Sequence, residues 1–215
     1  VSTVRITKLS RKEIIHLSRE INILSKLIHP SFLKFIGFSL IGFKSSQKSV
    51  IVSEIPPSNN LSQILDKERN NEKIDGWNDT QKLICLYGIS LGMSYMHSNG
   101  IIHRNLSTKS VFLDENLFPK IGNFGLLTKF HDLTNQTMIN LDENLLISSP
   151  ELLLSNEYSK SCDVYSFAFV LYSILTNEEP YMNYNQYEFF MNVIHNGERP
   201  EMNSKIPPSF QSLIQ

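Results

Sequence analysis

The most chemically informative segment of the sequence runs from residue 101 to residue 127 and reads IIHRNLSTKSVFLDENLFPKIGNFGLL. Its layout is typical of a phosphate-transfer site, but amides stand at two positions where carboxylates would be expected. Asn105 follows His103–Arg104, and Asn123 precedes Phe124–Gly125. An amide can accept a hydrogen bond, but it has no charge with which to attract a metal ion or a proton. The segment therefore predicts a preserved layout with impaired chemistry.

Composition limits the kind of protein that positions these residues. The chain has 215 residues, of which 41% are hydrophobic and 19% charged, as is ordinary for a soluble globular protein. Its formal net charge of −1 provides no overall attraction to nucleic acid or to an anionic membrane, and we expect neither partner. The run Phe167–Leu175 is too short to span a membrane. Cys85 and Cys162 lie far apart and favour buried thiols in a reducing, cytoplasmic compartment.

The first part of the chain predicts strands around one helix. Residues 3–9 alternate between apolar and polar side chains, as in a strand with one buried face. A helical repeat follows, formed by Leu17, Ile21, Leu24 and Ile28. It should end at His29–Pro30, because the residue before a proline avoids helical angles. Residues 32–40 and 49–55 then predict an antiparallel pair of strands.

The rest of the chain predicts a mainly helical body after the break at Pro56–Pro57. Helices are expected at residues 61–67, 79–97, 163–176 and 185–196, and short strands at Val111–Leu113 and Pro119–Ile121. The buried face of the second helix should comprise Leu83, Leu86, Ile89, Met93 and Met96, and Asn99–Gly100 should end it. We predict an α+β fold in one domain, residues 1–215, divided into parts 1–54 and 55–215.

Seven motifs, in this order, resemble the catalytic domain of protein kinases, and the tyrosine-kinase-like group most closely. They are EINILSKLIHP, IVSEI, GMSYMHSNGIIHRNL, NFG, SPE, DVYSFAFVLY and GERPEM. The 18 residues from Asn105 to Asn123 match the separation of the two corresponding motifs in an active kinase. The resemblance implies a two-lobed kinase fold, of which this chain would begin at the third strand of the small lobe and end before the last helices of the large lobe.

The resemblance also assigns chemical roles, and the residues in those roles have changed. The proton-accepting position falls on Asn105, and the two magnesium-binding positions fall on Ser110 and Asn123. General-base catalysis of the missing kind is typically worth ~10²–10⁴ in rate. The nucleotide hinge would be Glu54–Ile55. Ser53 before it is either a small gatekeeper that leaves a back pocket open or simply a small residue at the end of a strand.

The phosphate-binding lysine of the family's third strand falls on Thr7 if Val4 and Ile6 take the buried positions. Placing Lys8 there would turn polar side chains toward the core, because a slip of one residue reverses every side chain of a strand. A bulge that lets Lys8 compensate stays open. Glu20 would be the partner of that lysine, and it has either lost its partner or is an ordinary solvated charge.

The structural positions of the family are kept. Leu24, His103 and Phe124 fall where the family stacks a regulatory spine, and Arg104 falls where a phosphorylated loop residue would dock. The segments that fold this loop back and tie the catalytic loop to a buried helix would contain Gly125, Pro150, Glu151 and Asp163. Without the arginine that normally pairs with it, Glu151 is expected to be a strained or exposed charge.

We therefore expect a pseudokinase, a kinase fold that acts as a protein-binding or allosteric signalling module. Its partner would be another protein, such as an active kinase or a scaffold. No cofactor should be required, ATP binding should be weak and Mg²⁺ binding impaired, and the six histidines lack metal-ligand spacing. Two alternatives stay open: an active serine/threonine kinase with atypical metal ligands, and a degraded fragment without a function of its own.

Overall fold

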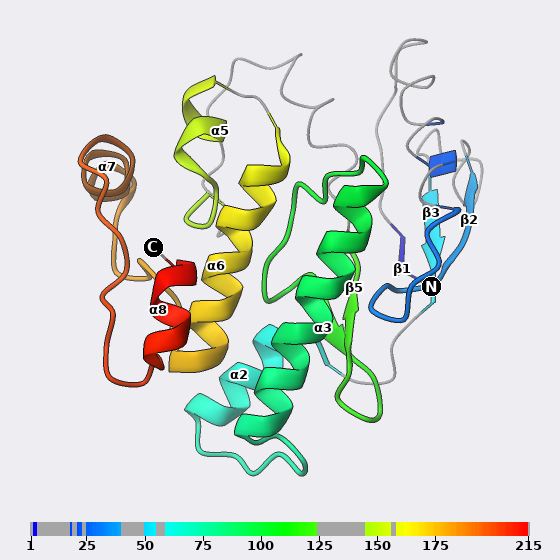
Figure 1. Cartoon of the computed structure of the whole chain (residues 1–215), viewed down its shortest axis with the longest axis horizontal. Helices are drawn as coiled ribbons and strands as arrows, with labels where there is room; N and C mark the ends of the chain where they lie inside the picture. Colours follow the sequence, from blue (N-terminus) through cyan, green and yellow to red (C-terminus); the bar gives the residue numbers. More distant parts are fainter. Residues whose placement is uncertain are drawn as a thin grey trace.

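A computed structural model of the chain describes residues 2–3, 18, 21–22, 25–39, 50–54, 59–123, 145–155 and 158–214. A small sheet lies on one side of the molecule, and a larger, mainly helical body forms the rest (Figure 1). This arrangement confirms the predicted α+β class. The division at residues 54 and 55 stays a prediction.

The small sheet consists of β1 (Ser2–Thr3), β2 (Phe35–Ser39) and β3 (Val50–Ser53), in the order β1-β3-β2. β3 pairs antiparallel with both neighbours, which confirms the antiparallel pair predicted from the sequence. The register shifts by one residue between Phe35 and Gly37, as at a β-bulge. Residues 4–10, on which the choice between Thr7 and Lys8 depends, lie outside the described residues.

The segment before β2 begins as a helix and then leaves it. Ser25 donates its amide N–H to the carbonyl of Ile21 at 2.8 Å, and Ile21 is buried as predicted. Ile28 was predicted on the same buried face, and that prediction is wrong, because its side chain is 86% exposed. The chain enters a turn at residues 25–26, so helical spacing no longer decides which way Ile28 points.

Short contacts attach this segment to the helical body. The N–H of Leu33 donates to the carbonyl of Ile121 at 2.9 Å, and the rings of His29 and Tyr95 stack with centroids 5.1 Å apart. Gly92 permits a close approach, since a Cβ there would lie 2.9 Å from Cδ1 of Ile121. The two parts of the molecule are therefore joined directly beside β5 (Pro119–Ile121).

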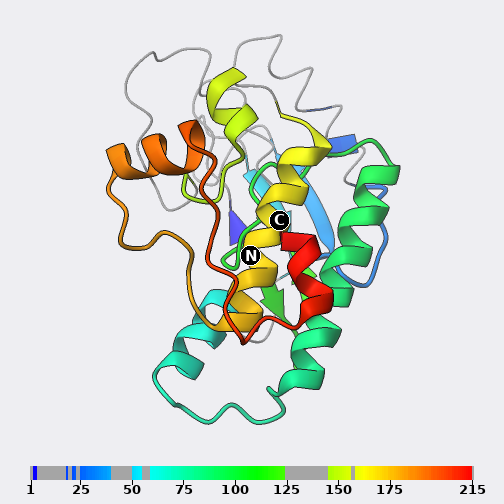
Figure 2. The same ribbon diagram turned by 60° about the vertical axis from the view of Figure 1, so that its left-hand side comes forward.

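The body consists of α2 (Leu61–Arg69), α3 (Asp79–Ser98), the hairpin of β4 (Val111–Leu113) and β5, α5 (Pro150–Ser155), α6 (Lys160–Thr176), α7 (Gln186–Glu188), a π-helix (Phe189–His195) and α8 (Pro208–Ile214). α6 lies beside both α3 and α8 (Figure 1 and Figure 2). Three of the predicted helices are confirmed to within a few residues at each end. The fourth, predicted over 185–196, is instead a single α-helical turn that continues as the π-helix.

Local side chains explain where the helices begin and end. Asn60 caps α2 in a reciprocal capping box with Gln63, and the side chain of Asn78 accepts the N–H of Gln81 at the start of α3. Gly100 follows α3 with φ +74°, a conformation that glycine adopts without a Cβ penalty. These caps orient α3 so that its carboxyl end leads directly into the segment singled out from the sequence.

The buried faces of α3 and α6 form the centre of the core. Cys85 and Met96 are completely buried on α3, as is Ile174 on α6. The prediction for Leu83 is wrong: it is 46% exposed, because it lies on the solvent-facing stripe of α3, four residues before Tyr87. Among the described helices, none has the length and apolarity needed to span a membrane.

Candidate functional site

Residues 101–110, which we call the polar loop, connect α3 to β4. Within it, His103 is completely buried, and its Nδ1 accepts the N–H of Asn105 at 3.2 Å. The proton of the neutral ring therefore sits on Nε2, which donates to the carbonyl of Gly122 at 3.0 Å. Burial lowers the pKa of His103 to about 4, opposed in part by the charge of Asp163. The ring is thus neutral near pH 7 and joins the loop to the end of β5.

Asp163, in the first turn of α6, holds the polar loop from the other side. Its carboxylate is 2% exposed and accepts the N–H of His103 at 2.7 Å and that of Arg104 at 2.9 Å. The same carboxylate lies 2.8 Å from Nε2 of His97. Burying a carboxylate is costly unless its oxygens are hydrogen-bonded, and these three contacts meet that need. Asp163 therefore ties the loop to the buried helix.

Two residues of the site have left-handed backbone angles. Arg104 has φ 67° and Asn123 has φ 52°. The left-handed region is uncommon for residues with side chains, although asparagine tolerates it better than arginine. The bond from the Arg104 N–H to Asp163 helps to fix this conformation. The Arg104 guanidinium then lies 5.8 Å from the ring centroid of Tyr158, within cation–π range.

The side chain of Asn105 turns toward the segment that follows β5. Its Nδ2 donates to the backbone carbonyl of Asn123 at 3.0 Å. The Asn123 side chain is exposed to solvent. The two amides that replace the expected carboxylates are therefore brought together, but the contact runs from the side chain of one to the backbone of the other.

The hydroxyl of Ser110 faces inward. The residue is 1% exposed, and its Oγ donates to the carbonyl of Ser107 and accepts the N–H of Ser107, both at 2.9 Å. The carbonyl of Ser110 accepts the N–H of Gly122, also at 2.9 Å. Ser110 thus closes a turn of the polar loop and supports the end of β5.

The three changed positions do not fit a magnesium ion. Mg²⁺ prefers carboxylate and phosphate oxygens in octahedral geometry. Asn123 offers a neutral amide, Ser110 a buried hydroxyl that is already bonded, and Asn105 an NH₂ donor directed at a carbonyl. Within the part of the chain that the structure describes, no group of three or more His, Cys, Asp or Glu side chains could hold a metal ion.

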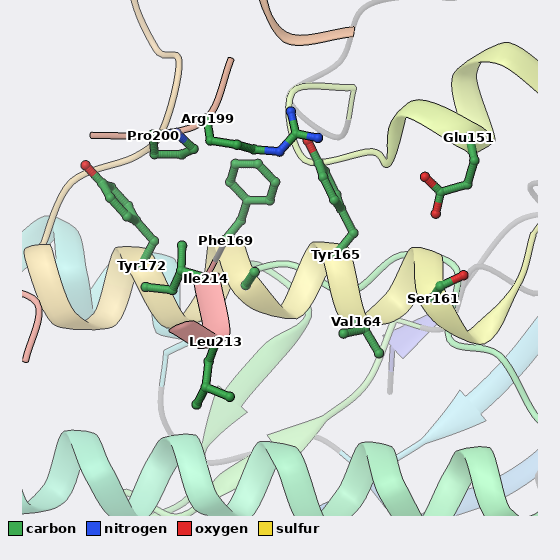
Figure 3. A pocket seen from close by; sticks show the side chains of 11 residues that line it. Glu151, Ser161, Val164, Tyr165, Phe169, Tyr172, Arg199, Pro200, Leu213 and Ile214 are labelled. Carbon is green, nitrogen blue, oxygen red and sulfur yellow. The ribbon is translucent and has the colours of Figure 1, made fainter. Parts of the chain in front are cut away.

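Pro150 and Glu151 open α5, and the Glu151 side chain is exposed. It lies at the edge of a pocket of about 270 Å³ between α5, α6 and α8 (Figure 3). Apolar side chains form much of the wall, and two of them, Val164 and Leu213, are 59% and 64% exposed. Across the described ranges, no cationic side chain forms an ion pair with Glu151.

The gatekeeper position and one residue of the predicted nucleotide hinge can be placed. Ser53, at the gatekeeper position, ends β3, and the N–H of Glu54 in the hinge donates to the carbonyl of Lys34 at 2.9 Å. Ser53 and Glu54 are both half-buried. The remaining predicted positions lie outside the described residues: Thr7, Glu20, Leu24, Ile55, Phe124 and Gly125. Their assignments stay predictions.

Three residues of the site were not found from the sequence. They are His97, which contacts Asp163, Ser107, which binds the Ser110 hydroxyl, and Gly122, whose carbonyl accepts from His103. Gly122 also permits close packing, because a Cβ there would lie 2.4 Å from Cδ1 of Leu33. Only His97 had a usable signal, since it is a polar residue in the last turn of a helix whose opposite face is buried.

A family model described as "Protein tyrosine and serine/threonine kinase" matches residues 3–215, almost the whole chain. The match includes the polar loop, the hairpin of β4 and β5, and α6. The residues that support the loop and the three neutral positions therefore lie within one matched region.

Individual relatives carry kinase names. The chain is 31% identical to the dual specificity protein kinase shkD of Dictyostelium discoideum over 219 residues, which cover 100% of this chain and 28% of that protein. It is 33% identical over 201 residues to a protein of the same organism named "Probable LIM domain-containing serine/threonine-protein kinase", covering 92% of this chain and 29% of that protein. The chain thus spans less than a third of the length of either relative.

Proposed function

This chain belongs to the protein tyrosine and serine/threonine kinase family, and within that family we propose that it is a pseudokinase. Such a domain keeps the kinase fold, transfers little or no phosphate, and acts through protein binding or allosteric regulation. The observation that carries the proposal is the neutral character of Asn105, Ser110 and Asn123 at the proton-accepting and metal-binding positions.

Charge is what phosphate transfer needs most from these positions. The reaction depends on positioning and on neutralising the charge of the phosphates, largely through bound metal ions. An amide dipole at Asn123 replaces a full negative charge, and Asn105 has no basic oxygen pair to take up a proton. We propose that ATP binds weakly and that Mg²⁺ is not held.

The intact support of the polar loop favours a binding role over simple decay. Asp163 and His103 are buried and hydrogen-bonded where they hold the loop backbone. A domain without a function would have no need to keep this loop in shape. We propose a protein partner, a place in the tyrosine-kinase-like group and a cytoplasmic setting. The alternative, an active serine/threonine kinase with atypical ligands, is supported by the names of the relatives.

Nucleotide-dependent thermal stability separates the two functions. The melting temperature of the purified protein would be measured with ATP, with and without Mg²⁺. A ligand at about 100 times its dissociation constant adds ~2.7 kcal/mol of stability, which is easily seen. The pseudokinase is expected to show no increase that depends on Mg²⁺.

A stabilisation that requires both ATP and Mg²⁺ would contradict the pseudokinase. Stabilisation by ATP alone would support a metal-free nucleotide sensor, which is a form of the same proposal. Cooperative, two-state melting of the protein without ligand would distinguish a functional module from a degraded fragment.

A further inference from the structure

Three hydrogen bonds join the polar loop to the two residues that follow β5. Nε2 of His103 donates to the carbonyl of Gly122, and the N–H of Gly122 donates to the carbonyl of Ser110. The third bond runs from Nδ2 of Asn105 to the carbonyl of Asn123 at 3.0 Å. Only the third depends on a side chain at one of the changed chemical positions.

An aspartate at position 105 could not make this bond. An ionised carboxylate is an acceptor only, and the carbonyl of Asn123 also only accepts. An aspartate there would therefore place two acceptors against each other. The amide does more than remove a charge, because it supplies a donor that joins two separate segments.

The bond acts on a backbone with little support of its own. Asn123 has φ 52°, which is uncommon for a residue with a side chain, and its own side chain is exposed. A donor on its carbonyl fixes the direction of the following peptide plane. Among the described residues, the bonds of His103 and Ser110 to the end of β5 are made with the preceding residue, Gly122.

We propose that Asn105 is a latch that holds residues 122–123 against the polar loop without nucleotide or metal. The surface around the loop then keeps one shape in the ligand-free protein. A partner that binds this surface then meets a binding-competent conformation that is already the major population, so its apparent affinity is not reduced. The inference concerns the folded geometry and stands whether or not phosphate is transferred.

The test compares Asn105→Ala and Asn105→Asp with the wild-type protein by hydrogen exchange and thermal melting. Loss of one hydrogen bond should raise the exchange rate of the backbone amides of residues 120–123 about 2–10-fold and lower the melting temperature by about 2–4 °C. Asn105→Asp should be at least as strongly affected as Asn105→Ala, because it adds acceptor repulsion. Adding ATP with Mg²⁺ to the wild-type protein should leave exchange in this segment unchanged.

Asn183→Asp is the matched control, since Asn183 is exposed and the same change of charge occurs away from the loop. It should leave both measurements at wild-type values. The latch would be overturned if the amides of residues 120–123 exchanged as slowly in Asn105→Asp as in wild type, or if ATP with Mg²⁺ clearly slowed their exchange in the wild-type protein. The comparison of Asn105→Asp with the wild-type protein involves no nucleotide, so it can fail while the proposed function stands, whereas slowed exchange with ATP and Mg²⁺ would count against both.

Discussion

Two groups of residues share the polar loop and differ in what they contribute. The buried pair, His103 and Asp163, is closed to solvent and is hydrogen-bonded to backbone groups on both sides of the loop. In the proposed pseudokinase, the neutral group, Asn105, Ser110 and Asn123, stands at the positions where kinase chemistry would need charge or a metal ligand. On this proposal the first group keeps the structural role, and the second lacks two carboxylates and a metal ligand on which phosphate transfer would depend.

This difference separates the shape of the loop from its charge. The bonds that position the loop backbone come from a buried carboxylate, a neutral imidazole, the Ser110 hydroxyl and main-chain groups. None of them needs a carboxylate at position 105 or 123. The charges that phosphate transfer would need can therefore be absent while the loop keeps its path. Substitutions in the two groups should accordingly have very different effects on stability.

The largest effect is expected for Asp163→Ala. The change removes the acceptor for two backbone amides and the contact with His97, leaving buried donors unsatisfied. Breaking such a network typically costs about 3–5 kcal/mol. Chemical denaturation should report a loss of that size. Asp75→Ala is the control, because Asp75 is 94% exposed, and equal losses in the two variants would mean that the buried pair does not determine the fold of the loop.

The pH dependence of stability tests the other member of the pair. Burial lowers the pKa of His103 from 6.5 to about 4, so the unfolded chain takes up this proton first as the pH falls. The contribution of neutral His103 to the free energy of unfolding is fully present above pH 6.5. It is lost as the pH falls toward 4, by about 3 kcal/mol in total.

Denaturation midpoints measured from pH 7.5 to pH 4 would check this dependence. The variant His103→Gln should be less stable at neutral pH and should lose less stability on acidification. His195→Gln, at an exposed histidine, should keep the wild-type slope. A wild-type slope in His103→Gln would show that other groups cause the acid sensitivity.

A smaller effect is expected where the end of β5 passes close to Leu33. In Gly122→Ala the new Cβ would lie 2.4 Å from Cδ1 of Leu33, so that side chain must move. Such overpacking typically costs about 1–3 kcal/mol. Gly37→Ala is a matched control in β2, with no atom within 4 Å of the added Cβ. Equal stability of the two variants in urea would argue against close packing at Gly122.

The smallest effect is expected for Asn123→Asp, which restores the charge at one position of the neutral group. The side chain is exposed, and aspartate also tolerates the left-handed backbone. The free energy of unfolding should change by no more than about 0.5 kcal/mol. A loss as large as that of Asp163→Ala would erase the contrast between the two groups.

Much of the fold could be predicted from the sequence, because local signals and the tertiary structure agree there. Asn99–Gly100 marks the end of α3, and the alternating segments 32–40 and 49–55 contain the paired strands β2 and β3. Leu83 was misplaced because periodicity gives the spacing of apolar residues but not which stripe faces the core, and Ile28 because the helix ends before it. The π-helix after α7 had no sequence signal of its own.

The identities of the changed site residues were predictable, but their orientations were not. The sequence revealed that Asn105 and Ser110 replace charged or metal-binding groups. It could not reveal that Asn105 donates to a backbone carbonyl, or that the Ser110 hydroxyl points into a turn. The first fact depends on how the fold brings together two residues 18 positions apart, and the second on the backbone path of the local turn at Ser107.

The central claim is most directly tested by incubating the purified protein with γ-labelled ATP, Mg²⁺ and a mixed protein substrate. An active dual specificity relative serves as the positive control. Since the lost general base alone is typically worth ~10²–10⁴ in rate, incorporation should stay at background. The account would be contradicted if label appeared on the substrate and disappeared in Asn123→Ala.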